Sequence, residues 1–368
     1  MNKGQKKVIL WVFAIAAVSV LAIFSYAVFR DKGTKKEPEV AESTRIPVAT
    51  EPAPTKNPHE NMVKSKLTGQ WISKETDKKR PFAVVINNIE YAFGHQTGTA
   101  KADILYEALA EGGIPRMMAL YENVDNIKQI GSIRSARHYF VQFAYEWDAI
   151  YCHFGHTKYA TAKIKKLKVD NISGLSAIGP VAYRRTGRWR APHNVYTSGK
   201  MLLKGAKKLK YTTKRKNNNM AEHFTFYDKD TALSSGKKAE TAVLPFSYYA
   251  TCKLVYNKKK KQYYKFEYGK KHLDQAGKKQ LAFKNVIIQL VKEKNIDLNG
   301  YQTMELSNNQ GSGYYLTNGK QISIRWERVE SSNTMRYYTE EGELLTLNPG
   351  KVYIAVFPKN RQKLIRIK

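Results

Sequence analysis

The chain has 368 residues and a formal net charge of +32 at pH 7, from 63 lysines and arginines against 31 acidic residues. Its two cysteines, Cys152 and Cys252, are too few for a disulfide scaffold, which excludes the small disulfide-rich class. Cys152 lies in an apolar run and is expected to be a buried thiol, while the sequence leaves open whether it pairs with Cys252.

The N-terminal segment predicts a membrane anchor. Residues 8–29 contain no charged side chain and are numerous enough to cross a bilayer as a helix. Lysines precede this run and no small-residue cleavage pattern closes it, so it is interpreted as an uncleaved transmembrane signal anchor. The flanking charges place residues 1–7 in the cytoplasm as a short tail and the folded region outside the cell membrane, in a single-pass arrangement.

This location changes the meaning of the positive charge. Nucleic acid is the usual partner of so basic a surface, but none is expected outside the membrane. Anionic wall polymers and lipid head groups are the polyanions present there. The positive charge is concentrated in blocks at 184–190, 200–216 and 258–261. A solvated basic surface without a specific partner is the alternative interpretation of these blocks.

The chain after the span divides into three parts. Residues 30–66 contain five prolines and mixed charges, so they are predicted to be a disordered extracellular tether. Residues 67–225 are predicted to be an N-terminal α/β domain, and residues 226–368 a C-terminal β-rich domain. The overall fold class is therefore predicted to be α+β.

The N-terminal domain alternates strand-like and helix-like patterns, which is typical of a mixed sheet covered by helices. Its predicted strands are 80–88, 104–109 and 117–121, and its predicted helices are 135–145, 159–167 and 199–209. The C-terminal domain is expected to be mainly antiparallel, because turn signals such as Asn318-Gly319 separate its strand-like runs. Those predicted strands are 247–256, 262–268, 286–291, 313–316, 321–327, 335–339 and 352–357.

The stretch 131–138 is the strongest indication of a ligand site. It is predicted to open a helix, so that Arg134 and Arg137 share one face of the first turns. Ser132 and Ser135 are small enough to leave backbone N–H groups free for a ligand. Cations beside a helix N-terminus suit a phosphate or carboxylate, and Arg116 lies near in sequence.

Three acidic residues form a second candidate cluster. Asp103, Glu107 and Glu111 recur every four residues, which aligns them on one face of either a strand or a helix. Such carboxylates serve general acid–base catalysis or bind a metal. The alternative is that they form ion pairs with the arginines named above.

Histidines supply the third candidate cluster. His153 is predicted to end a strand, while His193 and Asn194 follow the arginine block at 184–190. Each histidine is a candidate ligand-binding group, base or metal ligand, with a hydrogen-bonded core residue as the alternative. The sequence contains no HExxH, CxxC, GxSxG or P-loop motif, so no metal site is assigned and the cofactor is left unknown.

Short motifs follow one another in order across residues 80–358, at 80–88, 102–113, 133–137, 192–194, 285–289, 311–314 and 347–350. In these motifs the chain resembles the YerB-like family of bacterial envelope proteins, a family of unknown function found mainly in Gram-positive bacteria. The resemblance implies an α/β region followed by a distinct C-terminal region, and it implies no particular reaction. Many members of that family are lipoproteins with a cysteine at the end of the signal sequence. This chain has no cysteine before Cys152, so the span itself is expected to be the anchor.

Three functions remain open from the sequence. The first is a membrane-anchored envelope protein that binds an anionic cell-wall polymer or lipid-linked precursor through its basic surface and the arginine segment. The second is a hydrolase or transferase acting on wall glycan or a lipid-linked precursor with the clustered carboxylates. The third is a scaffold for other envelope proteins.

Overall fold

The structure is a computed structural model that describes residues 59–215, 223–306, 309–329 and 334–368. The predicted cytoplasmic tail, the membrane span at 8–29 and the tether up to residue 58 lie outside the described residues. Among the residues that are described, no helix is both long enough and apolar enough to cross a membrane. The described residues belong to one compact unit of the chain.

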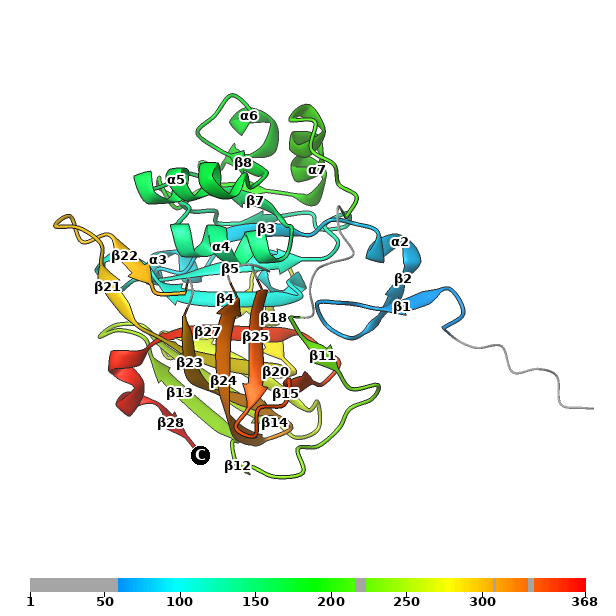
Figure 1. Cartoon of the computed structure of the whole chain (residues 1–368). Helices are drawn as coiled ribbons and strands as arrows, with labels where there is room; N and C mark the ends of the chain where they lie inside the picture. Colours follow the sequence, from blue (N-terminus) through cyan, green and yellow to red (C-terminus); the bar gives the residue numbers. More distant parts are fainter. Residues whose placement is uncertain (1–58, 216–222, 307–308, 330–333) are drawn as a thin grey trace, which may run out of the picture. The chain divides into compact units, whose positions relative to one another are not determined.

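In the described part of the chain, eleven strands form the central sheet (Figure 1). β27, close to the C-terminus of the chain, lies between β4 and β20 and runs parallel to both. The predicted domain boundary between residues 225 and 226 stays a prediction, but this sheet runs across it. Its order is β12 (Lys237–Lys238), β24 (Lys320–Val329), β23 (Gln310–Thr317), β20 (Asn285–Val291), β27 (Val352–Pro358), β4 (Ile104–Leu109), β5 (Pro115–Tyr121), β3 (Phe82–Asn87), β7 (Ile150–His153) and β8 (Asn171–Ser173), with β25 (Thr334–Thr339) paired to β24.

Strand direction defines one functional edge of this sheet. β5 is antiparallel to both β4 and β3, and β3 is parallel to β7 and β7 to β8. The carboxyl ends of β20, β27, β4, β3, β7 and β8 therefore lie at the same edge, which we call the carboxyl edge. Ligands of open α/β sheets bind beyond this edge.

Within the described residues, the three helices longer than six residues and α6 lie at one end of the central sheet. α4 (His138–Glu146), α5 (Lys158–Leu167), α6 (Gly179–Ala182) and α7 (Gly199–Lys208) gather around β3, β7 and β8 (Figure 1). Ser198 caps α7, as its side chain accepts a hydrogen bond from the amide of Met201 at 3.2 Å. The predicted helices at 159–167 and 199–209 are thus confirmed within one residue at each end. The other helical segments are short: α2 (Lys74–Asp77), α3 (Glu90–Phe93), η1 (Thr99–Lys101), η2 (Glu111–Gly113) and η3 (Lys359–Leu364).

A second sheet, six-stranded within the described residues, faces β27 and its neighbours. Aromatic side chains fill the space between the two sheets, with the rings of Phe246 and Phe357 centred 5.1 Å apart and those of Phe283 and Tyr353 5.3 Å apart. The fold class is therefore α+β and rich in strands. This sheet contains β13 (Thr241–Pro245), β14 (Thr251–Asn257), β15 (Gln262–Glu267), β16 (Lys270–Lys271), β19 (Ala282–Phe283) and β28 (Arg366–Ile367).

Short strand pairs complete the fold. The first of them corrects the tether prediction, because residues 62–64 form β1 and Ser65 is buried, with its hydroxyl donating to Glu122 at 2.6 Å. The pairs are β1 (Met62–Lys64) with β2 (Trp71–Ser73), β11 (Thr225–Phe226) with β26 (Thr346–Leu347), β17 (Leu273–Asp274) with β18 (Lys279–Gln280), and β21 (Glu293–Asn295) with β22 (Gln302–Met304). A small three-stranded sheet has β10 (Val195–Thr197) between β6 (Ile130–Gly131) and β9 (Arg184–Arg185).

Candidate functional site

The arginine segment at 131–138 does not open a helix as predicted. α4 begins at His138, so Arg134 lies before the helix and Arg137 is its N-cap residue. The two arginines therefore share no helical face, and this part of the sequence prediction is wrong. They nevertheless lie near a common neighbour, Arg116, since the positive charge of each lowers the pKa of Arg116.

The segment is extended because it is inserted between β3 and β7 beyond the point where these strands pair. The amide of Arg134 donates to the carbonyl of Val85 at 3.0 Å, and the carbonyl of Arg134 accepts from the amide of Phe154 at 3.0 Å. The amide of Ala136 donates to the carbonyl of Gly155 at 2.9 Å. These backbone N–H groups serve the fold, whereas the sequence interpretation reserved them for a ligand. The insertion carries the arginine side chains to the carboxyl edge.

Two glycines allow the segment at 131–137 to pack closely against Tyr196 and the loop after β7. Gly131 has a φ of 156°, and a Cβ there would lie 2.6 Å from a ring carbon of Tyr196. Gly155 has a φ of 91°, and a Cβ there would lie 2.5 Å from the hydroxyl of Ser135. A side chain at either position would push the segment away from its neighbours.

Arg137 is held by a carboxylate. Its Nε donates to both oxygens of Glu111, at 2.6 and 2.7 Å, and its Nη2 also contacts that carboxylate. Burial alone would raise the pKa of Glu111, but the hydrogen bonds and charge of Arg137 lower it below its usual value. The alternative of carboxylate–arginine pairing is therefore realised for Glu111, which follows β4 in η2.

The other two guanidinium groups have no such partner. Arg116, at the start of β5, is 5% exposed, and within the described part of the chain its side chain donates one hydrogen bond, to the carbonyl of Ser135 at 3.1 Å. The Nε atoms of Arg116 and Arg134 are both buried without a hydrogen-bond partner among the described residues. Burial and the positive charges of Arg137 and Arg134 lower the pKa of Arg116 to about 9. We call Arg116, Arg134, Arg137 and Glu111 the arginine site.

The arginine site has an excess of positive charge. Its three guanidinium groups face one carboxylate, which leaves two cations uncompensated by this set. Buried charges are normally paired, and planar guanidinium groups bind phosphate or carboxylate in a bidentate manner. The arrangement is therefore suited to a bound anion, which would supply the missing negative charge.

Polar groups on the end of β3 extend the arginine site. The amide Nδ2 of Asn87 lies 2.9 Å from Nδ1 of His193 and donates to the hydroxyl of buried Ser132 at 3.2 Å. Burial and the nearby charges of Arg134 and Arg190 lower the pKa of His193. His193 therefore lies next to the arginine site as a neutral ring at physiological pH. The sequence analysis assigned no role to Asn87.

Two other predicted ligand residues are used inside the fold. His153, at the end of β7, is 1% exposed, and its ring nitrogens lie 2.7 Å from the carbonyl of Gly155 and 3.2 Å from Oδ1 of Asn171. Burial lowers its pKa to about 4. Asn194 accepts from Arg185 at 2.8 Å and holds the turn before β10. The hydrogen-bonded core alternative therefore describes His153.

The predicted carboxylate cluster is not assembled. Asp103 lies at the amino end of β4, where it accepts from the amide of Glu122 at 2.8 Å. Glu107 is buried in the middle of the strand, and Glu111 follows the strand at the arginine site. Strand geometry separates the first two by about 13 Å along the chain. The three side chains therefore lie in three different environments.

Glu107 belongs to a network that the sequence analysis missed. Its carboxylate lies 3.0 Å from Nζ of Lys265, accepts from Tyr353 at 2.6 Å and accepts from Asn88 at 2.8 Å. Lys265 also contacts Glu267, and these three charged side chains are fully buried. We call Glu107, Lys265 and Glu267 the buried triad. It joins β4 of the central sheet to β15 of the second sheet.

No strand signal reveals the triad. β15 alternates partly exposed and buried residues, and Tyr263, Lys265 and Glu267 all face inward. The opposite face carries Tyr264 and Phe266, so alternation in the sequence alone would place Lys265 and Glu267 toward solvent.

The triad is also the place where described residues come closest to a metal-binding set. Oxygen atoms of Glu107 and Glu267 and the sulfur of Cys252 lie within 4.8 Å of one another. The ammonium group of Lys265 lies among them and balances one carboxylate. Burial and the charge of Glu107 raise the pKa of Glu267 to about 8, so the second carboxyl is mostly protonated at neutral pH. Both cysteines are free and buried, so the open question of their pairing is answered.

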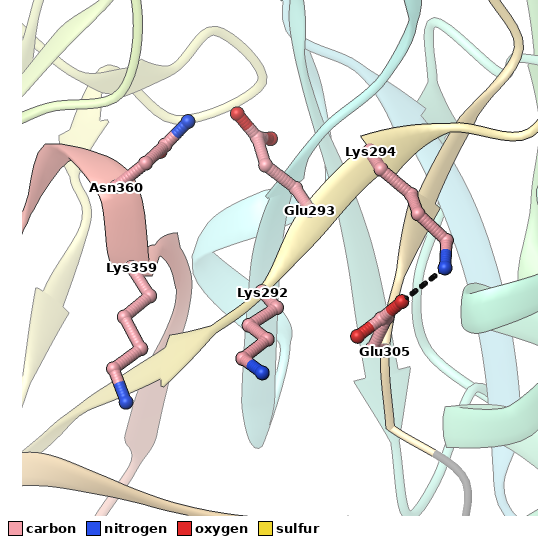
Figure 2. A pocket seen from close by; sticks show the side chains of 6 residues that line it. All are labelled: Lys292, Glu293, Lys294, Glu305, Lys359 and Asn360. Atoms are coloured by element: carbon pink, nitrogen blue, oxygen red, sulfur yellow. Dashed lines mark ion pairs between the residues drawn. The ribbon is translucent and has the colours of Figure 1, made fainter.

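A separate basic pocket of about 290 Å³ lies at the ends of β20 and β27 (Figure 2). Figure 2 shows Lys294 paired with Glu305, at 2.5 Å, and Glu293 accepts from Gln302 at 2.9 Å. Its acidic side chains therefore already have partners. This pocket is lined by Lys292, Glu293, Lys294, Glu305, Lys359 and Asn360.

Comparisons with known proteins identify relatives of the chain. Residues 67–212 match the model described as the N-terminal domain of a protein of unknown function, DUF3048, and residues 242–354 match the DUF3048 C-terminal domain. The chain is 30% identical over 303 residues to the putative lipoprotein YerB of Bacillus subtilis (strain 168), which covers 80% of this chain and 86% of the relative. The crystal structure of the Bacillus subtilis YerB protein superimposes with a TM-score of 0.73 at 28% identity, covering 83% of this chain and 99% of that one.

Proposed function

The chain belongs to the DUF3048 family that includes YerB, and from that premise we propose that it is a membrane-anchored envelope protein that binds an anionic ligand at the arginine site. The ligand class is a cell-wall polymer or lipid-linked precursor that carries phosphate or carboxylate. The observation that carries the proposal is the uncompensated pair of guanidinium groups, Arg116 and Arg134, at the carboxyl edge.

The surface next to the arginine site supports the same proposal. Exposed arginines at 184, 185, 188 and 190 lie on the turn that leads to His193. Such a cluster raises the local concentration of a polyanion and accelerates its association. A polymer with repeated negative charges is then attracted by the surface and bound specifically by the guanidinium groups of buried Arg116 and partly buried Arg134.

The envelope location is supported by two independent features. The Bacillus subtilis relative is named a putative lipoprotein, and this chain has an uncharged run at 8–29 that is long enough to cross a bilayer. Both features are means of attachment to a membrane. An anchored protein with a basic surface outside the membrane would meet anionic wall material and lipid head groups.

The test is a binding measurement on the full-length chain. Inorganic phosphate and purified wall teichoic polymer are titrated calorimetrically into the wild-type protein and the double variant Arg116→Gln/Arg134→Gln. This variant removes the two uncompensated cations and leaves the Arg137–Glu111 pair intact. We expect binding of both probes to weaken by at least about tenfold, since a charged hydrogen bond contributes roughly 1.5–3 kcal/mol and 1.4 kcal/mol is tenfold.

A charge-matched control separates the site from the general basic surface. Lys259 and Lys260 are exposed in the turn between β14 and β15, so Lys259→Gln/Lys260→Gln removes the same charge elsewhere. It should leave phosphate binding unchanged and weaken polymer binding only at low salt. Equal affinity of the arginine variant and the wild-type protein for both probes would refute the proposal. Arg134→Gln alone serves as the second variant if the double variant is unstable.

The enzyme alternative stays a prediction that no observation favours. Its proposed acid, base or metal ligands, Asp103, Glu107 and Glu111, lie in separate environments. The scaffold alternative likewise stays a prediction.

A further inference from the structure

A cavity of about 360 Å³ lies beside the arginine site, and its size suits a small-molecule group. The turn before β10 supplies Arg188 and Trp189, and the loop after α3 supplies His95 and Thr97. The turn between β17 and β18, at 275–278, closes the opposite side. The cavity is thus formed by segments that lie far apart in the sequence, between residues 94 and 278.

Two residues that line this cavity each hold a buried polar atom without a partner in the described part of the chain. His95 is 5% exposed and Thr97 is 6% exposed, and both line the cavity. Nε2 of His95 and the hydroxyl of Thr97 are buried without a hydrogen-bond partner among the described residues. Buried polar atoms normally have partners, and leaving one unsatisfied is costly. A ligand hydroxyl is a chemical group that can donate to one and accept from the other.

Aromatic rings form the wall of the same cavity. The indole of Trp189 stacks on His95 with centroids 4.2 Å apart and planes inclined by 14°. Tyr196 lines the cavity as well, and its hydroxyl donates to the carbonyl of His95 at 3.0 Å. Aromatic walls with a few fixed polar atoms are typical of sites that orient a small polar molecule.

The cavity is connected to the arginine site through His193. The ring of Tyr91 lies 5.5 Å from that of His95 and 5.0 Å from that of His193. His193 in turn lies close enough to Arg134 for the arginine charge to lower its pKa. Tyr91 and His193 thus lie between the cavity lining and Arg134, and one elongated ligand that passes these rings would place its anionic group at Arg134 and its neighbouring group in the cavity.

We propose that this cavity is a sugar or polyol subsite, so that the ligand of the arginine site is a glycosyl or polyol phosphate. This inference rests on the proposed function and adds the chemical class of the ligand. The phosphate binds the guanidinium groups, while ring or chain hydroxyls bond to His95 and Thr97 beside Trp189. An anion without hydroxyl groups would occupy the arginine site and leave the cavity empty.

The test compares three probes on the full-length chain: inorganic phosphate, N-acetylglucosamine 1-phosphate and glycerol 3-phosphate. The wild-type protein should bind at least one of the two organic phosphates about tenfold more tightly than inorganic phosphate. Thr97→Val removes the hydroxyl while keeping the shape of the side chain. It should reduce this preference severalfold and leave the affinity for inorganic phosphate unchanged.

Thr99 offers a matched control, because its buried hydroxyl is also without a partner among the described residues but does not line the cavity. Thr99→Val should keep the full preference. Trp189→Leu should reduce the preference and Trp189→Phe should restore part of it. Equal wild-type affinities for all three probes, or a preference that Thr97→Val and Trp189→Leu leave intact, would overturn the subsite while the arginine site stands. Absence of binding by every probe would overturn both proposals.

Discussion

The buried triad and the arginine site use the same kinds of side chain and differ in how their charges are balanced. In the triad, Lys265 lies between Glu107 and Glu267, and the second oxygen of Glu107 accepts from Asn88. In the arginine site, Glu111 neutralises Arg137 while Arg116 and Arg134 remain uncompensated. One oxygen of Glu267 is also buried without a partner among the described residues, but the pKa of this carboxyl is raised to about 8, so at neutral pH the triad holds one cation and one anion. The arginine site keeps its excess of cations and lies next to the exposed arginines at 184–190.

This difference teaches how to separate a structural charge cluster from a binding one. Burying charges is costly, so a cluster that serves the fold alone must provide its own counter-charges. A cluster with excess charge of one sign is stabilised when a ligand supplies the opposite sign. The sign and size of a buried cluster's net charge therefore indicate its function better than the number of its charged residues does.

The largest effect on stability is expected from removing the ammonium group of the buried triad. Lys265→Met leaves two buried carboxylates without their cation, which should lower the free energy of unfolding by about 3–5 kcal/mol. Urea denaturation measures the change. Lys259→Met, in the exposed turn that precedes β15, is the control and should leave the urea midpoint unchanged. A loss below about 1 kcal/mol for Lys265→Met would show that the triad is not needed for stability.

The next effect should separate binding from stability at the arginine site. Arg134→Gln should weaken phosphate binding by about tenfold or more. The variant should unfold at a temperature no lower than the wild-type protein in phosphate-free buffer, because it removes the repulsion of Arg134 with Arg137 and with Arg116. Calorimetric titration and thermal unfolding measure the two quantities. Marked destabilisation without phosphate would instead assign Arg134 a structural role.

A smaller effect should appear in the pH dependence of stability. Burial raises the pKa of Glu267 to about 8, so this carboxyl binds its proton more tightly in the folded than in the unfolded state. Its contribution is complete below the unfolded pKa of about 4.3 and is lost as the pH rises through about 8. Glu267→Gln, which cannot ionise, should therefore gain at least about 1 kcal/mol relative to the wild-type protein between pH 5 and pH 8. Parallel stability curves for the two proteins would contradict this assignment.

The smallest effect concerns the accessibility of the two cysteines to a thiol reagent. Cys252 borders the triad, and burial raises the pKa of its thiol well above the usual range. We expect neither Cys252 nor Cys152 to react with a thiol reagent in the native protein, and both to react after denaturation. Rapid labelling of Cys252 under native conditions would mean that the triad opens to solvent.

Individual strands and helices could be predicted from the sequence better than the pairing between strands. The strand at 104–109 and the helix at 159–167 follow from strand-like and helix-like patterns in the sequence, and the structure contains both. The insertion of β27 between β4 and β20 depends on the pairing of Val352 with Ile104, 248 positions away, which periodicity cannot reveal. The extended path of 131–137 depends in the same way on β3 and β7. Local propensity favoured a helix there, and tertiary hydrogen bonds produced an extended segment.

The candidate site shows the same division. Sequence spacing drew attention to Arg134, Arg137 and Glu111, which do meet. It grouped Glu111 with Asp103 and Glu107 because equal spacing suggests one face, yet a strand also carries equally spaced residues far apart along its length. Trp189 stood between the arginines of the block at 184–190 without being considered. Its significance depends on its contact with His95, which only the fold creates.

The central claim is that the arginine site holds an anion while the buried triad does not. It is tested most directly by anomalous diffraction from crystals of this chain grown with molybdate, a tetrahedral oxyanion. The account predicts an anomalous peak within hydrogen-bond distance of the guanidinium groups of Arg116 and Arg134, and none at Lys265. Crystals in which molybdate binds elsewhere on the surface and leaves Arg116 and Arg134 without an anion would contradict it.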